Sequence, residues 1–452
     1  MVAKSKKTRS TDQRFSDVPL VTAPDYETPS ANRRVELYRG KFQIHHDGAS
    51  TTEKGPILLE WFPSPRIRFS FDPGSASSLN KYRPGKMLKI HIPKYGLRGS
   101  AFVTHWGSEG VRGVFSDTLE GITSKSDDPS IQRLIFHLPN FRRLDGMAVR
   151  SGRTVHFARY ECQSSESRLT LDPAPHMDEN IDRLSSRGGY AFTYTGTIER
   201  CDGKTFRKKH AVKLLEHLHL FLSFCAGRWT SPMLVAGTGR HGATVWRHWA
   251  VWKTSPWTSS RNWLPLHSGP RGAFDGFMKL AETEDHFRAL GAAIHWYVES
   301  NGQSGGVDGG LILSQAALEL LAWQKLVVIE DIVDEGAFRD LTAYSKIRML
   351  LRNCSIPLEI PKDLREKASK LEYSPKDGAG LITSIRNDTV HPPKKGAYAR
   401  PPSEAIIAAW KLSLWYVELV ILSMCGHSGS YHNRTTATGT VRDEVPVPWS
   451  AG

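Results

Sequence analysis

The stretch RKKHAVKLLEHLHLFLSFCA, residues 207–226, is where the hydrophobic pattern of the chain changes. Its apolar residues recur every three or four positions, which predicts an amphipathic helix that ends before Gly227. Ahead of it the apolar residues follow the two-residue period of strands, and from Phe274 onward they follow the period of helices. The sequence therefore predicts an α+β protein, with an antiparallel β-rich N-terminal domain and an all-α C-terminal bundle.

Short alternating apolar runs, separated by turn residues such as Asp72-Pro73-Gly74, predict the strands. The runs are Ile67–Phe71, Met87–Ile92, Ala101–Trp106, Arg133–Leu138, Val155–Tyr160, Leu169–Leu171 and Tyr190–Ile198. Many short strands at near-regular spacing favour a sandwich or a barrel-like sheet.

Beyond Phe274 the pattern predicts helices near residues 274–281, 284–300, 310–330, 337–351, 361–371, 377–390 and 403–425. Long helices joined by short loops indicate a bundle. Residues 405–425 are also long and apolar enough to span a bilayer. Lys411 and Glu418 would be costly in lipid, which favours a buried bundle helix and no membrane association.

These patterns divide the chain into five predicted parts. They are a flexible basic lead (1–35), a β-rich domain (36–205), a mixed helical and Trp-rich connecting region (206–270), the helical domain (271–426) and a disordered tail (427–452).

The net charge of +14 over 452 residues is unevenly distributed, because residues 1–270 sum to +16 and residues 271–452 to −2. A basic front suggests a polyanionic partner, although plain solubility explains it equally well. Five scattered cysteines without a C-x-x-C pair argue against a disulfide scaffold and for a reducing, cytoplasmic location.

Several motif matches lack the context that their chemistry needs. Gly237-x-Gly239-x-x-Gly242 precedes a strand-like run instead of a helix, so we interpret it as a hairpin turn. Gly302-x-Ser304-x-Gly306 follows a helical segment, so we interpret it as an inter-helix loop instead of a nucleophile elbow. His217 and His219 would point about 200° apart on a helix, and no metal or cofactor site is predicted.

Trp246, Arg247, His248, Trp249, Trp252 and Lys253 interleave aromatic and basic side chains. Such a pattern is typical of platforms on which single-stranded nucleic acid stacks, but also of strands in a core. We favour the core.

The segment DGAGLITSIRNDTVHPP, residues 377–393, carries the most chemistry. Pro392 disfavours the helical conformation at His391, so His391 is expected to end the helix, a little over one turn beyond Arg386. An arginine can hold a phosphodiester oxygen and a histidine can transfer a proton at the scissile bond. RNA supplies its own 2′-hydroxyl nucleophile, so this chemistry needs no metal. The alternative is a helix end with a histidine placed favourably against the helix dipole.

Arg386-Asn387-Asp388-Thr389-Val390-His391 resembles the R-x(4–6)-H motif of the HEPN superfamily. The order of helices around it, over roughly residues 275–425, is similar to that of HEPN bundles. A β-rich domain ahead of such a bundle, with the segment Phe136–Phe141, is similar to ApeA-type anti-phage proteins. The resemblance implies a metal-independent endoribonuclease in defence or a toxin-like role, acting as a homodimer, with RNA as substrate and an unknown trigger ligand for the β-rich domain.

The resemblance also implies roles for particular residues. His391 would be the general acid and base, Arg386 would hold the phosphate and Asn387 would position either group. Glu319 would be a supporting residue, and Lys394, Lys395 and Arg400 form a local basic cluster for substrate. Asp388 departs from the expected charge beside a phosphate. A non-catalytic protein that binds nucleic acid or a protein partner and dimerises through the bundle is the alternative.

Overall fold

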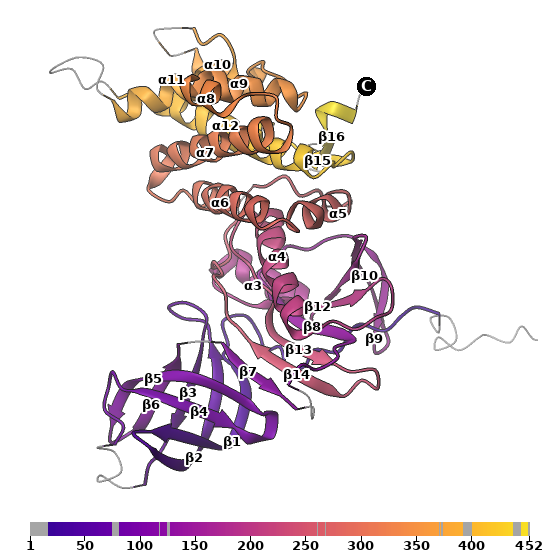
Figure 1. Cartoon of the computed structure of the whole chain (residues 1–452), viewed down its shortest axis with the longest axis vertical. Helices are drawn as coiled ribbons and strands as arrows, with labels where there is room; N and C mark the ends of the chain where they lie inside the picture. The colour runs from indigo at the N-terminus through magenta and orange to yellow at the C-terminus, as the bar shows by residue number, and fades with distance from the viewer. Residues whose placement is uncertain are drawn as a thin grey trace, which may run out of the picture. The chain divides into compact units, whose positions relative to one another are not determined.

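The computed structural model describes residues 17–74, 81–116, 118–123, 127–259, 261–266, 268–369, 371, 374–391, 400–436 and 444–450. The chain divides into two compact units. Unit 1 comprises residues 1–161, 166–211 and 232–251, and unit 2 comprises residues 162–165, 212–231 and 252–452. Unit 1 is β-rich and unit 2 is mainly helical, so the α+β prediction is confirmed (Figure 1).

Fourteen strands of unit 1 form one hydrogen-bonded sheet. They are β1 (Val35–His46), β2 (Ala49–Glu60), β3 (Arg66–Phe71), β4 (Met87–Ile92), β5 (Leu97–Gly107), β6 (Gly110–Phe115), β7 (Leu119–Ile122), β8 (Arg133–Pro139), β9 (Met147–Ser151), β10 (Thr154–Gln163), β11 (Ser167–Pro173), β12 (Phe192–Arg200), β13 (Met233–Thr238) and β14 (Thr244–Trp249). A 3₁₀ turn, η1 (Pro93–Tyr95), joins β4 to β5, and helix α3 (Met177–Arg187) lies between β11 and β12.

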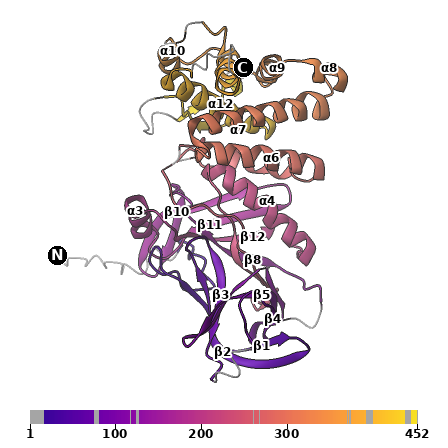
Figure 2. The same cartoon turned by 90° about the vertical axis from the view of Figure 1, so that its left-hand side faces the viewer.

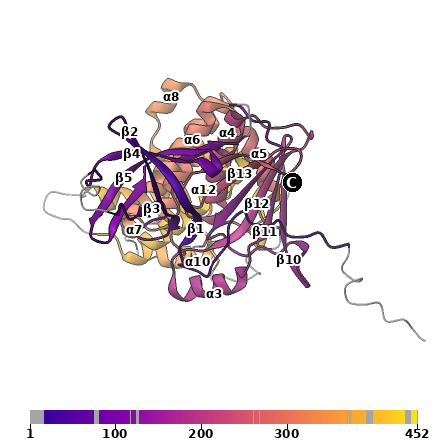
Figure 3. The same cartoon turned by 90° about the horizontal axis from the view of Figure 1, so that it is seen from below.

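The first six strands close on themselves, because β4 pairs with both β1 and β5 in the order β4-β1-β2-β3-β6-β5. Figure 3 shows the indigo strands β1 to β5 of this barrel. Side chains alternate between its core and its outer face, as in β4, where Leu88, Ile90 and Ile92 are buried. Closure leaves these strands without a free edge, which explains why so many short strands are stable here.

The predicted strand runs do not include β1, β2, β6, β7 or β9, and no helix was predicted at 177–187, where the structure has α3. The outer half of the β1–β2 hairpin, His45–Lys54, contains no apolar side chain larger than that of Ala49, so its two-residue period is weak. Helix α3 has apolar residues only at Met177, Ile181 and Leu184.

The connecting region predicted over residues 206–270 is part of the folded units. β13 and β14 form an antiparallel hairpin whose turn contains Gly239 and Gly242, as the hairpin interpretation of that glycine motif predicted. This hairpin lies between β7 and β8 in the sheet. Trp246 and Trp249 are buried, at 0% and 1% exposure, which confirms the core interpretation for this pair.

Residues 17–35, within the predicted flexible lead, contact the sheet at specific points. Tyr26 is buried, and its hydroxyl accepts hydrogen bonds from Trp249 Nε1 at 2.7 Å and Arg247 Nη1 at 3.0 Å. Asp25 pairs with Arg247. This part of the lead is therefore anchored, because burying an arginine requires a carboxylate partner; residues 1–16 lie outside the described part of the chain.

Unit 2 contains most of α4 (Lys208–Ala226) and the helices after it. These are α5 (Arg271–Leu280), α6 (Glu284–Asn301), α7 (Gly306–Trp323), the π-helical turn η2 (Gln324–Ile329), α8 (Glu335–Asp340), α9 (Ala343–Asn353), α10 (Lys362–Ala368), α11 (Gly378–Val390) and α12 (Ser403–Met424). Helix α12 is the central one, packed against α6, α7, α9, α10 and α11 (Figure 2). The predicted helices are present, with 310–330 continuing into η2 and 337–351 divided into α8 and α9.

The tail predicted as disordered over 427–452 is folded in its described part. Strands β15 (Ser430–His432) and β16 (Glu444–Pro446) pair, and the 3₁₀ turn η4 (Pro448–Ser450) follows. Arg434 is 4% exposed and forms an ion pair with Glu418, which is fully buried in α12. Glu418 also accepts a 2.6 Å hydrogen bond from Tyr297 Oη, and Arg434 Nη2 donates to Asn301 Oδ1 at 2.8 Å. The tail folds back because the buried carboxylate needs a cation.

Two helical segments are long and apolar enough to cross a membrane by length and composition, residues 306–329 and α12. In α12, 89% of the apolar window is buried inside the protein, and the charge of Glu418 is neutralised there by Arg434. These features are those of a core helix.

Candidate functional site

The motif helix α11 begins at a capped and charge-neutralised N-terminus. Asp377 Oδ1 accepts a hydrogen bond from the backbone N–H of Gly380 at 2.9 Å. Its other oxygen lies 3.1 Å from Arg348 Nε and accepts a bond from Tyr344 Oη at 3.2 Å. Both partners belong to α9, so Asp377 ties the start of α11 to its neighbour.

One face of α11 is buried in the bundle. Leu381, Ile382 and Ile385 have no exposed surface, and the helix contacts α7, α9 and α12. At Gly378 a Cβ atom would lie 2.1 Å from Tyr416 Oη of α12, so only glycine allows this close approach. The orientation of α11, and with it the direction of its polar residues, is therefore determined by packing.

We expect Asp377→Ala to destabilise unit 2 by about 1–2 kcal/mol, because it removes the cap and the partner of Arg348. Asp377→Asn keeps a capping oxygen but not the charge, so a loss below about 1 kcal/mol is expected. Urea unfolding monitored by circular dichroism measures both. Equal losses in the two variants would show that the cap contributes nothing.

His391 ends α11 in the manner predicted from the following proline. It is the C-cap residue with an extended backbone, φ −117° and ψ 118°, and its N–H donates to Asn387 O at 2.7 Å. Its side chain is exposed. The imidazole is thus held at a helix end where a substrate can reach it.

Arg386 and Asn387 lie one turn before His391 on the same helix. Arg386 is half-buried, Asn387 is exposed, and Arg386 Nη1 donates to Asn387 Oδ1 at 3.2 Å. Asp388 is half-buried. Within the described residues, no hydrogen bond joins His391 to Arg386, so their proximity is that of consecutive helical turns.

The other predicted site residues are less directly connected to this helix end. Glu319 lies on α7, which contacts α11, and its carboxylate accepts a hydrogen bond from Gln315 Nε2 at 3.0 Å. Arg400 is exposed, but it donates to both oxygens of Asp308 at 2.8 and 3.0 Å. It would have to leave Asp308 to contact a substrate. Lys394 and Lys395 lie outside the described residues.

Gly302-x-Ser304-x-Gly306 lies between α6 and α7, as predicted for an inter-helix loop. Ser304 Oγ donates to Glu299 at 2.7 Å, and no strand precedes it, so the nucleophile-elbow geometry is absent there. Among the described residues, no group of three or more His, Cys, Asp or Glu side chains could hold a metal ion.

Sequence reasoning did not single out Arg348 and Tyr344 of α9, which hold the start of α11. Nor did it single out Arg434, which pairs with Glu418 of α12. A signal was present for Arg434, because a glutamate at the centre of an apolar helix requires a buried cation or a protonated state. Neither the spacing nor the composition indicates which arginine would supply that cation.

Two family models match parts of this chain, and both describe domains of YopA proteins. Residues 126–260 match the model of the YopA central domain, and residues 283–444 match that of the YopA C-terminal domain, which contains α11 and α12. In particular, the chain is 28% identical over 432 residues to the SPbeta prophage-derived uncharacterized protein YopA of Bacillus subtilis strain 168. That alignment covers 92% of this chain and 95% of the relative. No solved structure matches the chain.

Proposed function

We propose that the protein is a metal-independent endoribonuclease of the HEPN type, with its site at the C-terminal end of α11. The observation that carries the proposal is the placement of His391 as an exposed C-cap, one turn from Arg386 and Asn387 on a helix packed into a bundle. The proposal includes a cytoplasmic homodimer that acts in anti-phage defence or as a toxin, with which the prophage origin of the relative is compatible.

In the proposed reaction the 2′-hydroxyl of a ribose attacks the adjacent phosphorus. His391 takes up the 2′ proton and delivers a proton to the leaving 5′-oxygen, and Arg386 binds the non-bridging oxygens that gain negative charge. Asn387, held by Arg386, positions that guanidinium. The products are a 2′,3′-cyclic phosphate and a 5′-hydroxyl, so both the nucleophile and the leaving group belong to the RNA.

Incubation of the purified full chain with total RNA tests the proposal. We expect fragments with 2′,3′-cyclic phosphate and 5′-hydroxyl ends, produced at an undiminished rate in 10-fold excess EDTA over any added divalent ion. Analysis of the fragment ends by ligation and phosphatase treatment measures this. Products with 5′-phosphate ends, or loss of cleavage in EDTA, would contradict the mechanism.

The alternative is a binding protein whose bundle only dimerises. The ion pair between Arg400 and Asp308 favours this alternative, because Arg400, one of the predicted substrate contacts, already binds a carboxylate. Retained RNA binding without any cleavage, tRNA included, would support this alternative.

A further inference from the structure

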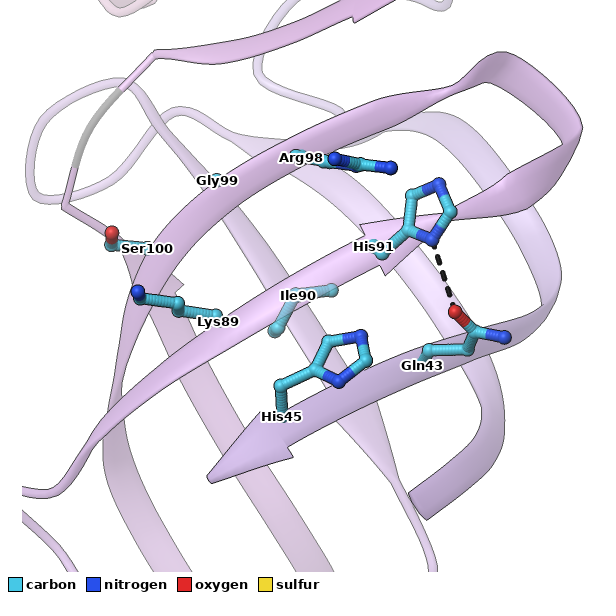
Figure 4. A pocket seen from close by; sticks show the side chains of 8 residues that line it. All are labelled: Gln43, His45, Lys89, Ile90, His91, Arg98, Gly99 and Ser100. Atoms are coloured by element: carbon cyan, nitrogen blue, oxygen red, sulfur yellow. Dashed lines mark hydrogen bonds between the residues drawn. The ribbon is translucent and has the colours of Figure 1, made fainter. Parts of the chain in front are cut away.

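The outer face of the barrel in unit 1 carries a basic depression of about 640 Å³. It is lined by residues of β1, β4 and β5, shown in Figure 4: Gln43, His45, Lys89, Ile90, His91, Arg98, Gly99 and Ser100. Four of these side chains are basic or imidazole groups and none is acidic. The sequence analysis attributed the positive charge to the N-terminal half without locating it.

Strand register explains why these side chains meet. Gln43 is opposite His91, and His91 is opposite Arg98, which makes one row across three strands. His45, Lys89 and Ser100 make a second, parallel row two residues along. Because side chains alternate between the faces of a strand, both rows project from the barrel while Ile44 and Ile90 between them point into its core.

The row of Gln43, His91 and Arg98 continues to Glu120 of β7, which is directly opposite Arg98 but accepts hydrogen bonds from Lys208 and Trp246. No carboxylate of the described residues forms an ion pair with Lys89, His91 or Arg98. Burial lowers the pKa of His91 most, and the neighbouring Arg98 and His45 lower it further. The depression therefore presents Lys89 and Arg98 with no carboxylate in its lining, which suits an anionic ligand.

We propose that this face of the barrel binds the phosphodiester backbone of a single-stranded nucleic acid. The two rows offer a point charge at Lys89, a planar donor at Arg98 and neutral hydrogen-bonding groups at Gln43 and Ser100, suited to successive phosphates and sugars along one strand. Gln43 Oε1 accepts from His91 Nδ1 at 3.0 Å, which holds that imidazole in a fixed orientation. The site is separate from α11; only the choice of RNA as probe rests on the proposed function.

Binding of a fluorescein-labelled 12-nucleotide RNA, measured by anisotropy, tests the proposal. Every chain carries His391→Ala so that the probe stays intact. Combining Lys89→Glu with Arg98→Glu should weaken binding at least 10-fold and reduce the slope of log K against log salt by about 1.4, since each neutralised phosphate of a single strand contributes about 0.7. Arg98→Lys keeps the charge and should remain within about 3-fold of the parent.

Arg153→Glu is the matched control, because Arg153 is exposed in the β9–β10 turn of the same unit. It should leave affinity and salt slope unchanged. Equal losses in the control and the double variant, or unchanged affinity in the double variant, would overturn the proposal. So would displacement of the RNA by the same concentration of phosphate groups added as inorganic phosphate, because a site for one phosphate does not need a strand. Cleavage is measured separately in chains that retain His391, so failure of the proposed function would not alter these outcomes.

Discussion

His391→Ala should reduce RNA cleavage by at least about 100-fold and leave the fold intact. General acid–base groups contribute about 10²- to 10⁴-fold to a rate, and His391 is the proposed proton donor and acceptor. Its side chain is exposed at the helix end, so its removal should change the free energy of unfolding by less than about 0.5 kcal/mol. Initial rates of fragment formation and urea unfolding measure the two quantities.

Arg386→Ala and Arg386→Lys test whether catalysis requires the planar guanidinium of Arg386 and not only its positive charge. Both should lose at least about 10-fold in rate, because lysine cannot hold two phosphate oxygens in the planar geometry of arginine. His241→Ala is the matched control for His391→Ala, since His241 is exposed in the β13–β14 turn of unit 1. A His391→Ala chain that cleaves RNA at more than a tenth of the wild-type rate would refute the assignment of the site.

Arg434→Ala should destabilise the protein by about 3–5 kcal/mol, the cost of leaving a buried carboxylate without its partner. Glu418 has no exposed surface, and with Arg434 absent it would retain hydrogen bonds from Tyr297 Oη and the Trp263 backbone but no cation. Arg261→Ala is the control, because Arg261 is an exposed arginine that donates to Thr436 O, and a loss below about 1 kcal/mol is expected. Urea unfolding at pH 7 measures the difference.

The pH dependence of this variant has a definite sign. Burial already raises the pKa of Glu418 from its ordinary 4.5, and the charge of Arg434 opposes that rise. Without Arg434 the folded state binds a proton more tightly than the unfolded state does. The stability of Arg434→Ala should therefore fall as the pH rises from about 4.5 toward neutrality.

Combining Glu418→Gln with Arg434→Ala should abolish that pH dependence and restore part of the lost stability, since no charge then remains buried. A double variant no more stable at pH 7 than Arg434→Ala would show that the arginine acts through packing instead of charge. Such a result would also show that the folded tail is not held in place by the buried charge of Glu418.

Local periodicity was sufficient to predict the fold class and most of the elements. The strand predicted at Met87–Ile92 has the bounds of β4, and helix 377–390 differs from α11 by one residue. Both have clear alternation or helical spacing bounded by turn or capping residues, so neighbouring residues alone determine them. The β1–β2 hairpin, whose outer half is polar, and the short α3 were missed because their stability comes from contacts with the rest of the sheet.

The position of His391 at the end of its helix could also be predicted, because a following proline restricts a single residue's backbone. The state of Arg400 could not, since Asp308 is 92 residues away in sequence. The same holds for the basic rows on the barrel, which require the register of β1, β4 and β5.

The sequence by itself thus determined the α+β class, the start of helix α4 near residue 207 and the motif Arg386-x4-His391. The tertiary structure alone decided that the early strands close into a barrel, that the tail supplies Arg434 to Glu418, and that Lys89 and Arg98 share one face. Periodicity and caps depend on residues within a few positions of each other, whereas strand closure and charge pairing depend on segments that meet only after folding.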